Sequence, residues 1–390
     1  MKDFLVILGR QPALGLAELE SLYGTAQVRP VGHDAAFVQA ETVNFDALGS
    51  AMKICKILAT LDTMDWREIE RYMIKSSVEH AHDVPEGKLQ IGISAYGFLV
   101  TPQQILATGL SIKKAIKKSG RSVRLTPNKE AALNTAQVLH NHLTGPMGGE
   151  LVLARDDGKT ILAQTLAAQD IDSYTLRDRG RPKRDTRVGM LPPKLAQIII
   201  NLAGGAADPN AKTLLDPFCG TGVVLQEALL MGYQAYGTDL EPRLVEYSRT
   251  NLEWFSKQFN NTGTYDLETG DATSHKWQPP IDIVASETYL GRPFTTSPSR
   301  EMLTQTVSEC NLIIKKFLKN IHTQLQPGTR LCLAIPAWKN ASGFTHLPLL
   351  DQISDLGYNR MSFEHASNEN LVYYRENQIV ARELLVIIRN

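Results

Sequence analysis

The stretch at residues 214–222, LLDPFCGTG, decides the fold of the C-terminal half of this chain. A short apolar run ends in Asp216, and Gly220 and Gly222 precede an apolar segment with helical character. Glycine lets the backbone turn sharply and lets a ligand approach the main chain without a clash against a Cβ atom. In open α/β sheets, a loop between a strand and the following helix is where a ligand binds. The stretch therefore predicts a nucleotide-cofactor loop rather than a tight turn without a ligand.

Two more carboxylates follow at the ends of the next two expected strands. Asp239 lies 23 residues after Asp216, and Asp271 follows one strand later. A carboxylate at Asp239 can accept hydrogen bonds from both hydroxyls of a ribose, and Asp271 with the backbone of Ala272 can meet an adenine amine. The spacing is not GxGxxG, which makes a dinucleotide-binding interpretation weak.

Strand and helix signals alternate regularly after residue 193. Helices are expected at 194–202, 223–231, 242–259 and 301–325, and strands at 213–215, 235–238, 264–268, 281–285 and 330–335. Such alternation predicts a doubly wound parallel sheet. A further helix at 348–356 and two strands at 371–374 and 383–388 predict an antiparallel hairpin at the edge of this sheet.

The first half of the chain has another pattern. Strands at 4–8, 89–94, 122–125, 150–154 and 160–167 are mixed at short spacing with helices that begin near residues 12, 45, 102 and 130. This mixture favours small α+β units over one large parallel sheet. Residues 177–193 are rich in Arg, Gly and Pro, which is typical of an interdomain segment. We therefore divide the chain into domains at 1–80, 81–170 and 194–390, with a linker at 171–193.

Composition limits the classes of protein to which the chain can belong. Its 390 residues are 43% hydrophobic and 21% charged, as in globular domains. No apolar run approaches the length of a membrane span, so no membrane partner is expected. The four cysteines have no CxxC spacing, which predicts a reduced, cytoplasmic compartment without disulfides or a zinc site. The nine histidines form no ligand pattern such as HExxH, so no metal is expected.

The formal net charge is zero, but the basic residues are concentrated in two stretches. The first, at 111–129, contains Lys113, Lys114, Lys117, Lys118, Arg121, Arg124 and Lys129 and no acidic residue. The second, at 177–194, contains Arg177, Arg179, Arg181, Lys183, Arg184, Arg187 and Lys194 against two aspartates. Basic clusters on a neutral chain indicate phosphate contacts, while a solvated helix face followed by a charged linker is the alternative.

These motifs resemble a known family. The loop DPFCGTG, followed by GTDL at 237–240, resembles the class I (Rossmann-like) methyltransferases that use S-adenosylmethionine. Over nearly its full length the chain resembles the THUMP-domain tRNA guanosine methyltransferases of archaea and eukaryotes. The run VILG at 6–9 is similar to that family's ferredoxin-like start, residues 133–167 to a divergent THUMP module, and GMLPPKLA at 189–196 to the helix that leads into the catalytic domain.

The resemblance implies a division of labour. A ferredoxin-like domain at 1–80 and a THUMP-like domain at 81–170 would grip tRNA, and the methyltransferase domain at 194–390 would methylate the exocyclic amine of a guanosine. Recognition by shape and phosphates suits a structured RNA, and the target base must leave its stack. The cofactor-binding residues implied by the resemblance are Asp216, Phe218, Gly220, Thr221, Gly222, Asp239, Leu240, Asp271 and Ala272.

The catalytic loop departs from the family pattern. The family carries Asp-Pro-Pro-Tyr after the fourth strand, whose acidic side chain and proline carbonyl accept hydrogen bonds from the amine while the aromatic ring stacks on the base. Here residues 286–292 read SETYLGR. One register puts Glu287 at the acidic position and keeps Gly291 aligned, whereas a register shifted by one residue puts Ser286 there and Tyr289 at the aromatic position. We prefer the first register because it retains a carboxylate.

The catalytic candidates are therefore Glu287, Tyr289 and Ser286. The extra methylene of Glu287 displaces its carboxylate, and a misplacement of about 1 Å can cost on the order of 100-fold in rate. Three outcomes stay open: retained amine methylation with altered loop geometry, a different nucleic-acid or protein acceptor, or a catalytically weakened or inactive RNA-binding protein. Tyr289 is a base-stacking platform or a packed aromatic residue.

Overall fold

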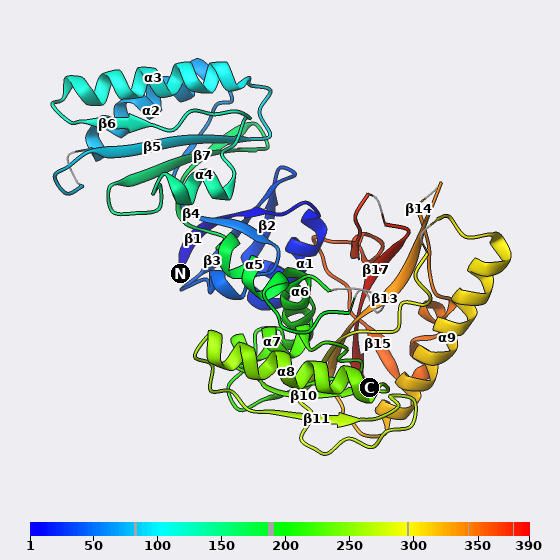
Figure 1. Ribbon diagram of the computed structural model, residues 1–390. Coiled ribbons are helices and arrows are strands. Elements are labelled where there is room, and N and C mark those ends of the chain that lie inside the picture. The colour runs from blue at the N-terminus through cyan, green and yellow to red at the C-terminus, as the bar shows by residue number, and fades with distance from the viewer. Residues whose placement is uncertain (82–83, 186–190, 295, 342, 377) are drawn as a thin grey trace. The chain divides into compact units, whose positions relative to one another are not determined.

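The computed structural model describes residues 1–81, 84–185, 191–294, 296–341, 343–376 and 378–390 (Figure 1). The chain forms two compact units. The first consists of Met1–Leu16, Thr25–Asp46 and Ser50–Ile171, and the second of Ala17–Gly24, Ala47–Gly49 and Asp172–Asn390. Three residues that carried sequence arguments, Arg187, Gly189 and Met190, lie outside the described residues.

The first unit is built on an eight-stranded sheet of order β2-β3-β1-β4-β8-β7-β5-β6. Its strands are β1 (Lys2–Leu8), β2 (Val28–Val31), β3 (Ala35–Ala40), β4 (Ala51–Leu61), β5 (Leu89–Tyr96), β6 (Val123–Leu125), β7 (Gly148–Asp156) and β8 (Lys159–Ala168). β5 pairs in parallel with β6 and β7, and the other pairs are antiparallel. The α+β pattern expected for this half is present. Because one sheet contains strands from both predicted N-terminal domains, the boundary at residue 80 stays a prediction.

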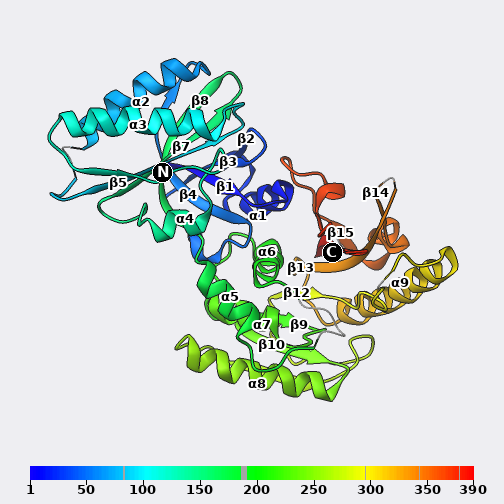
Figure 2. The same cartoon turned by 45° about the horizontal axis from the view of Figure 1, so that its top comes forward.

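Helices α2 (Trp66–His80) and α3 (Pro102–Lys118) lie together on one face of this sheet, and α4 (Thr135–His140) lies on the other (Figures 1 and 2). The predicted start of α3 is confirmed: the N-cap residue Thr101 and Gln104 form a reciprocal capping box, with Pro102 at the first helical position. Ile105, Ile112 and Ile116 recur at helical spacing and are buried against the sheet. The lysines of α3 lie on its solvent-facing side.

A carboxylate is buried in the sheet of this first unit. Glu150 is 0% exposed, and its Oε1 lies 2.5 Å from Lys53 Nζ. Ser94 Oγ donates to Oε1 at 2.5 Å, and Thr165 Oγ1 donates to Oε2 at 2.6 Å. Lys53 also donates to the Leu133 carbonyl at 2.7 Å. A buried charge is tolerated when it is paired and hydrogen-bonded, and Glu150 meets both conditions.

The second unit is built on a sheet of order β11-β10-β9-β12-β13-β17-β15, with β14 paired to β13 and β16 to β17. Its strands are β9 (Thr213–Asp216), β10 (Gln234–Asp239), β11 (Tyr265–Thr269), β12 (Ile283–Glu287), β13 (Arg330–Asn340), β14 (Gly343–Thr345), β15 (Tyr358–Arg360), β16 (Val372–Tyr373) and β17 (Val380–Arg389). β9 to β13 run parallel, and β17 is antiparallel to β13 and to β15. The predicted doubly wound parallel sheet with an antiparallel addition is confirmed.

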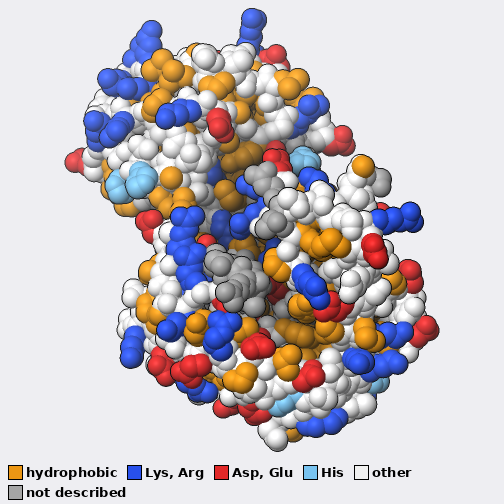
Figure 3. Space-filling model, turned by 45° about the vertical axis from the view of Figure 1, so that its right-hand side comes forward, with side chains coloured by type: hydrophobic (Ala, Val, Ile, Leu, Met, Phe, Trp, Pro, Cys, Tyr) orange, Lys and Arg blue, Asp and Glu red, His pale blue; other side chains and the backbone are white. Residues whose placement is uncertain are grey.

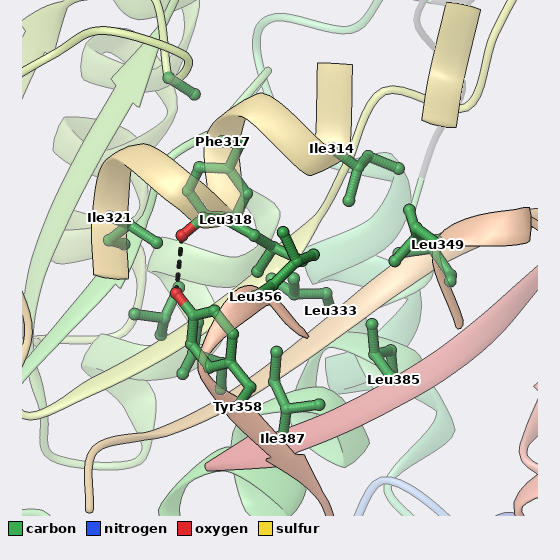
Figure 4. Packing of buried hydrophobic residues seen from close by; sticks show 14 of the residues in the cluster. Ile314, Phe317, Leu318, Ile321, Leu333, Leu349, Leu356, Tyr358, Leu385 and Ile387 are labelled. Atoms are coloured by element: carbon green, nitrogen blue, oxygen red, sulfur yellow. Dashed lines mark hydrogen bonds between the residues drawn. The ribbon is translucent and has the colours of Figure 1, made fainter. Parts of the chain in front are cut away.

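Helices cover both faces of this sheet. They are α5 (Ile171–Arg179), α6 (Pro193–Gly204), α7 (Val223–Leu230), α8 (Pro242–Gln258) and α9 (Arg300–His322). One face of α9 packs on β13 and β17 through a cluster of large apolar side chains that includes Ile314, Phe317, Leu333, Leu385 and Ile387 (Figure 4). In the same cluster the Tyr358 hydroxyl donates to the Leu318 carbonyl at 2.8 Å.

Three local predictions are corrected. The helix expected from residue 45 is a short 3₁₀ turn (Phe45–Ala47) followed by the 11-residue strand β4. The helix expected at 348–356 is two 3₁₀ turns, Pro348–Gln352 and Ser354–Leu356. Helix α5 occupies the first nine residues of the predicted linker, whose bounds stay a prediction. The C-terminal strand is not at the sheet edge, because β17 lies between β13 and β15.

Candidate functional site

The loop between β9 and α7 is shaped by glycines and held by α8. Gly220 and Gly222 have φ values of 53° and 81°, in the left-handed region that favours glycine. A Cβ atom on Gly222 would lie 3.0 Å from Ser248 Oγ. Ser248 Oγ donates to the Gly220 carbonyl and Asn251 Nδ2 donates to the Thr221 carbonyl, both at 2.9 Å. Sequence reasoning missed these two buried residues, whose only signal is a polar pair three positions apart on an apolar helix face.

Asp239 and Asp271, two of the three predicted carboxylates, accept their hydrogen bonds from backbone amides near this loop. Asp239 accepts from Gly220 N at 2.9 Å and from Glu241 N at 3.0 Å. Asp271 accepts from Thr273 N at 2.8 Å. Burial raises the pKa of Asp239, while its two amide donors act in the opposite direction. Both carboxylates are thereby oriented by the main chain.

The third carboxylate, Asp216, is 1% exposed. Ser286 Oγ donates to its Oδ1 at 2.5 Å and Phe218 N donates at 3.2 Å. The pKa of Asp216 is raised to about 7: burial is the largest cause, the negative charges of Asp239 and Glu287 also raise it, and the two hydrogen bonds act in the opposite direction. Among the described residues, no cation forms an ion pair with Asp216.

A cavity of about 740 Å³ opens at the carboxyl ends of β9, β10 and β12. This volume is within the range of small-molecule sites. Its lining combines residues from the loop after β9, the ends of β10 and β11, the loop after β12 and one side of α9. It includes every predicted cofactor-binding residue except Gly222, namely Asp216, Phe218, Gly220, Thr221, Asp239, Leu240, Asp271 and Ala272. The position between β9 and β12, where the connections diverge, is where ligands bind in doubly wound sheets.

The loop after β12 contributes the other side of the cavity. Glu287 and Tyr289 both line it. The Tyr289 hydroxyl lies 3.4 Å from Glu309 Oε1, a carboxylate of α9 that sequence reasoning missed and that also lines the cavity. Gly291 has a φ of 84°, and a Cβ atom there would lie 2.6 Å from Thr306 Cγ2, so the loop passes close to α9.

Ser286 is placed differently from its two neighbours. It is fully buried, does not belong to the lining residues and donates its hydroxyl to Asp216. Thr288 is also buried, and its amide donates to the Ala334 carbonyl at 3.1 Å. A side chain in the position of Ser286 can orient Asp216, whereas Glu287 and Tyr289 can reach a molecule in the cavity.

Glu287 has a partner that the sequence did not reveal. Its Oε1 forms an ion pair with Arg382 Nε of β17, 95 residues later. The two side chains are 15% and 7% exposed. Among the described residues, no donor contacts the second carboxylate oxygen of Glu287.

The two basic stretches differ in how far their side chains are exposed to solvent. In the second stretch Arg177 and Arg181 are 4% and 3% exposed, which contradicts a phosphate-binding role for them. Arg177 Nε pairs with the buried Glu227 at 2.8 Å, and Arg181 donates to Thr221 Oγ1 at 3.2 Å. Arg177 thus connects α5 to α7, and Arg181 connects the segment after α5 to the cofactor loop.

In the first stretch, Arg121 donates to the carbonyls of Ala81 and Pro85 and is therefore structural. The lysines of α3 instead line a shallow surface: Lys113, Lys114, Lys117 and Lys118, together with Leu110. Blue Lys and Arg side chains gather at the top of Figure 3, the end that carries α3 in Figure 1.

The described residues contain no group of three or more His, Cys, Asp or Glu side chains that could hold a metal ion. None of the described helices combines the length and the apolar character that a membrane span requires.

Residues 181–347 match the model of the UPF0020 family, described as an RMKL-like methyltransferase domain. This part of the chain is a methyltransferase domain. S-adenosylmethionine is the cofactor of this class, and the donor set fits it: the cavity has the right size, Asp239 offers oriented oxygens, and no cation of the described part of the chain pairs with Asp216. The predicted fold, domain class and cofactor are thus confirmed.

Two curated relatives are similar to part of the chain. The tRNA (guanine(10)-N2)-dimethyltransferases of Methanothermobacter thermautotrophicus and Pyrococcus abyssi are each 31% identical over 150 residues, which are 38% of this chain and 39% of each relative. The matched part thus spans about two-fifths of the relatives' length. The crystal structure of TrmN from Thermus thermophilus aligns over 100% of both chains with a TM-score of 0.53 and 16% identity, which extends the similarity of fold to the whole chain.

Proposed function

We propose that this protein transfers a methyl group to the exocyclic amine of a guanosine in tRNA. The observation that carries the proposal is the single cavity that joins the cofactor-side carboxylates to Glu287 and Tyr289. The guanosine-specific names of two relatives support the choice of acceptor.

On the cofactor side, backbone-oriented carboxylates would hold S-adenosylmethionine. When bound, this cofactor supplies a methyl group on a positively charged sulfur, and its transfer to an amine releases one proton. Asp239 would accept hydrogen bonds from ribose hydroxyls, and Asp271 with the Ala272 backbone would meet the adenine. Phe218 in the cofactor loop and Leu240 after β10 would supply apolar contacts to the cofactor. Asp216, which has no ion-pair partner in the described ranges of the chain, favours a positively charged ligand nearby.

On the acceptor side, Glu287 would accept a hydrogen bond from the target amine through its second carboxylate oxygen. Tyr289 would stack on the base after it has left its own stack. Holding the amine in near-attack geometry supplies most of the acceleration in a reaction of this type. Ser286 would act through Asp216. No metal is required.

The RNA would be held in part by the N-terminal half, with the ferredoxin-like region proposed at 1–80 and the THUMP-like region at 81–170. The exposed lysines of α3 support phosphate contacts. We place the protein in the cytoplasm, because its four cysteines are free and buried and tRNA is its proposed partner.

A second candidate is a cofactor-binding RNA-binding protein with little or no activity. It is favoured by the ion pair of Glu287 with Arg382, which occupies one oxygen of the proposed catalytic carboxylate.

The experiment that tests the proposal incubates the purified protein with labelled S-adenosylmethionine and unmodified total tRNA, with duplex DNA as competitor. Mass spectrometry then identifies the modified nucleoside. We expect N2-methylated guanosine, its loss in Glu287→Ala, and no competition by DNA. Tight cofactor binding without methylation of any RNA would support the second candidate, and a methyl group on another nucleoside or on DNA would contradict the choice of acceptor.

A further inference from the structure

Arg382 reaches Glu287 across an intervening strand. In the sheet order β12-β13-β17, Glu287 is paired with Ala334 of β13, and Arg382 is paired with Pro336 of β13. Residues two apart on a strand share a face of the sheet, so these four side chains lie on one face. Strands are spaced by roughly 4.8 Å, which puts β17 about 10 Å from β12. Two long side chains can span this distance over Ala334, whose side chain is short.

The ion pair of Glu287 and Arg382 is largely shielded from water, in an environment where a charge without a partner is unfavourable. Arg382 is 6% exposed as a residue, and the side chain of Glu287 is 15% exposed. Charge-assisted hydrogen bonds are stronger and more directional when they are shielded from water. The Glu287 side chain, held in this way, is restricted to one position at the carboxyl end of β12. A glutamate without such a partner would sample several rotamers.

The second carboxylate oxygen is then the one available to the cavity. Arg382 binds Oε1, and Glu287 lines the cavity together with Tyr289. Glutamate is longer than aspartate by one methylene, and a contact toward β17 draws its head back toward the sheet. The distance between the acceptor amine and the carboxylate is therefore set by two residues rather than by one.

We propose that Arg382 is a positioning residue for methyl transfer: it holds the Glu287 carboxylate at the distance that the target amine requires. This inference rests on the proposed function. Arg382 lies on the antiparallel strand β17, outside the residues 181–347 that match the methyltransferase family model.

A neighbouring ion pair provides a matched control. Glu383, the next residue on β17, is 2% exposed and pairs with Arg360 at 3.0 Å and with His346. Successive residues of a strand point to opposite faces, and neither Glu383 nor Arg360 lines the cavity. This pair has the same composition as that of Arg382 and Glu287, its arginine side chain is more exposed (26% against 7%), and neither of its residues lines the cavity.

The test compares Arg382→Gln with Arg360→Gln in single-turnover methyl transfer to tRNA. For Arg382→Gln we expect the rate at saturating tRNA to fall by about 100-fold, as for a misplacement of about 1 Å, with cofactor affinity measured by calorimetry within roughly 2-fold of wild type. Arg360→Gln should retain the wild-type rate. Arg382→Lys should recover part of the rate, because the ammonium keeps the charge but not the geometry of the guanidinium.

The variant Glu287→Asp provides a second, independent test of the positioning role. The shorter carboxylate cannot satisfy both Arg382 and the amine, so this variant should be slower than wild type, and its loss should shrink when Arg382→Gln is already present. A rate in Arg382→Gln equal to that of Arg360→Gln would overturn the positioning role, as would a faster rate, which would mean that the pair restrains Glu287. Absence of transfer by the wild-type protein would instead overturn the proposed function and the positioning role with it.

Discussion

The two units of this protein each bury a carboxylate in a β-sheet, and the two carboxylates are satisfied in different ways. Glu150 in the first unit has a lysine and two hydroxyl donors, and it lines no described cavity. Asp216 in the second unit has a hydroxyl and an amide donor, no cation among the described residues, and a cavity beside it. The first arrangement is complete without a ligand, whereas the second favours binding of a positively charged group. A buried carboxylate that has no cation partner and lies beside a cavity therefore indicates a ligand-binding site.

The largest effect is expected at the buried ion pair of the first unit. Lys53→Ala removes the cation beside Glu150 and should cost about 3–5 kcal/mol in free energy of unfolding, because a buried charge is left without its partner. Urea denaturation followed by circular dichroism measures this loss. Lys159→Ala, which removes the exposed ion pair with Asp62 in the same unit, should have a much smaller effect. Equal losses in the two variants would contradict the account of Glu150.

The opposite behaviour is expected in the second unit. The pKa of Asp216 in the folded protein, about 7, lies above its ordinary value of 3.8. The contribution of Asp216 to stability is therefore fully present below about pH 4 and is lost as the pH rises through about 7. In the absence of cofactor, the melting temperature of Asp216→Asn minus that of wild type should increase between about pH 4 and about pH 7. A difference that does not change with pH would show that Asp216 is as well neutralised as Glu150.

The local sequence predicted the cofactor half of the site because its signals are short-range. The glycines of 214–222 and the acidic ends of three strands follow from backbone geometry and strand order, and eight of the nine predicted cofactor residues line one cavity. The parallel sheet followed from apolar periodicity in the same way.

Long-range partners could not be predicted. Arg382 meets Glu287 because β17 lies next to β13, and a pairing between segments 95 residues apart leaves no local pattern. Arg177 and Arg181 were read as surface charges, but α5 carries them to the buried Glu227 and to Thr221. The strand β4 was mistaken for a helix because AMKICKILAT at 51–60 does not alternate strictly and short apolar runs fit both periods.

The most direct test of the account is a calorimetric titration of the protein with S-adenosylmethionine between about pH 6 and about pH 8, in buffers of different ionisation enthalpy, with Asp216→Asn as the control. A positive charge bound near Asp216 favours its ionised form. We therefore predict that affinity increases with pH through about 7 and that binding releases protons from wild type, with the part due to Asp216 absent in Asp216→Asn. The same pH dependence and the same proton release in both proteins would contradict the claim that Asp216 is the incomplete carboxylate around which the cofactor site is built.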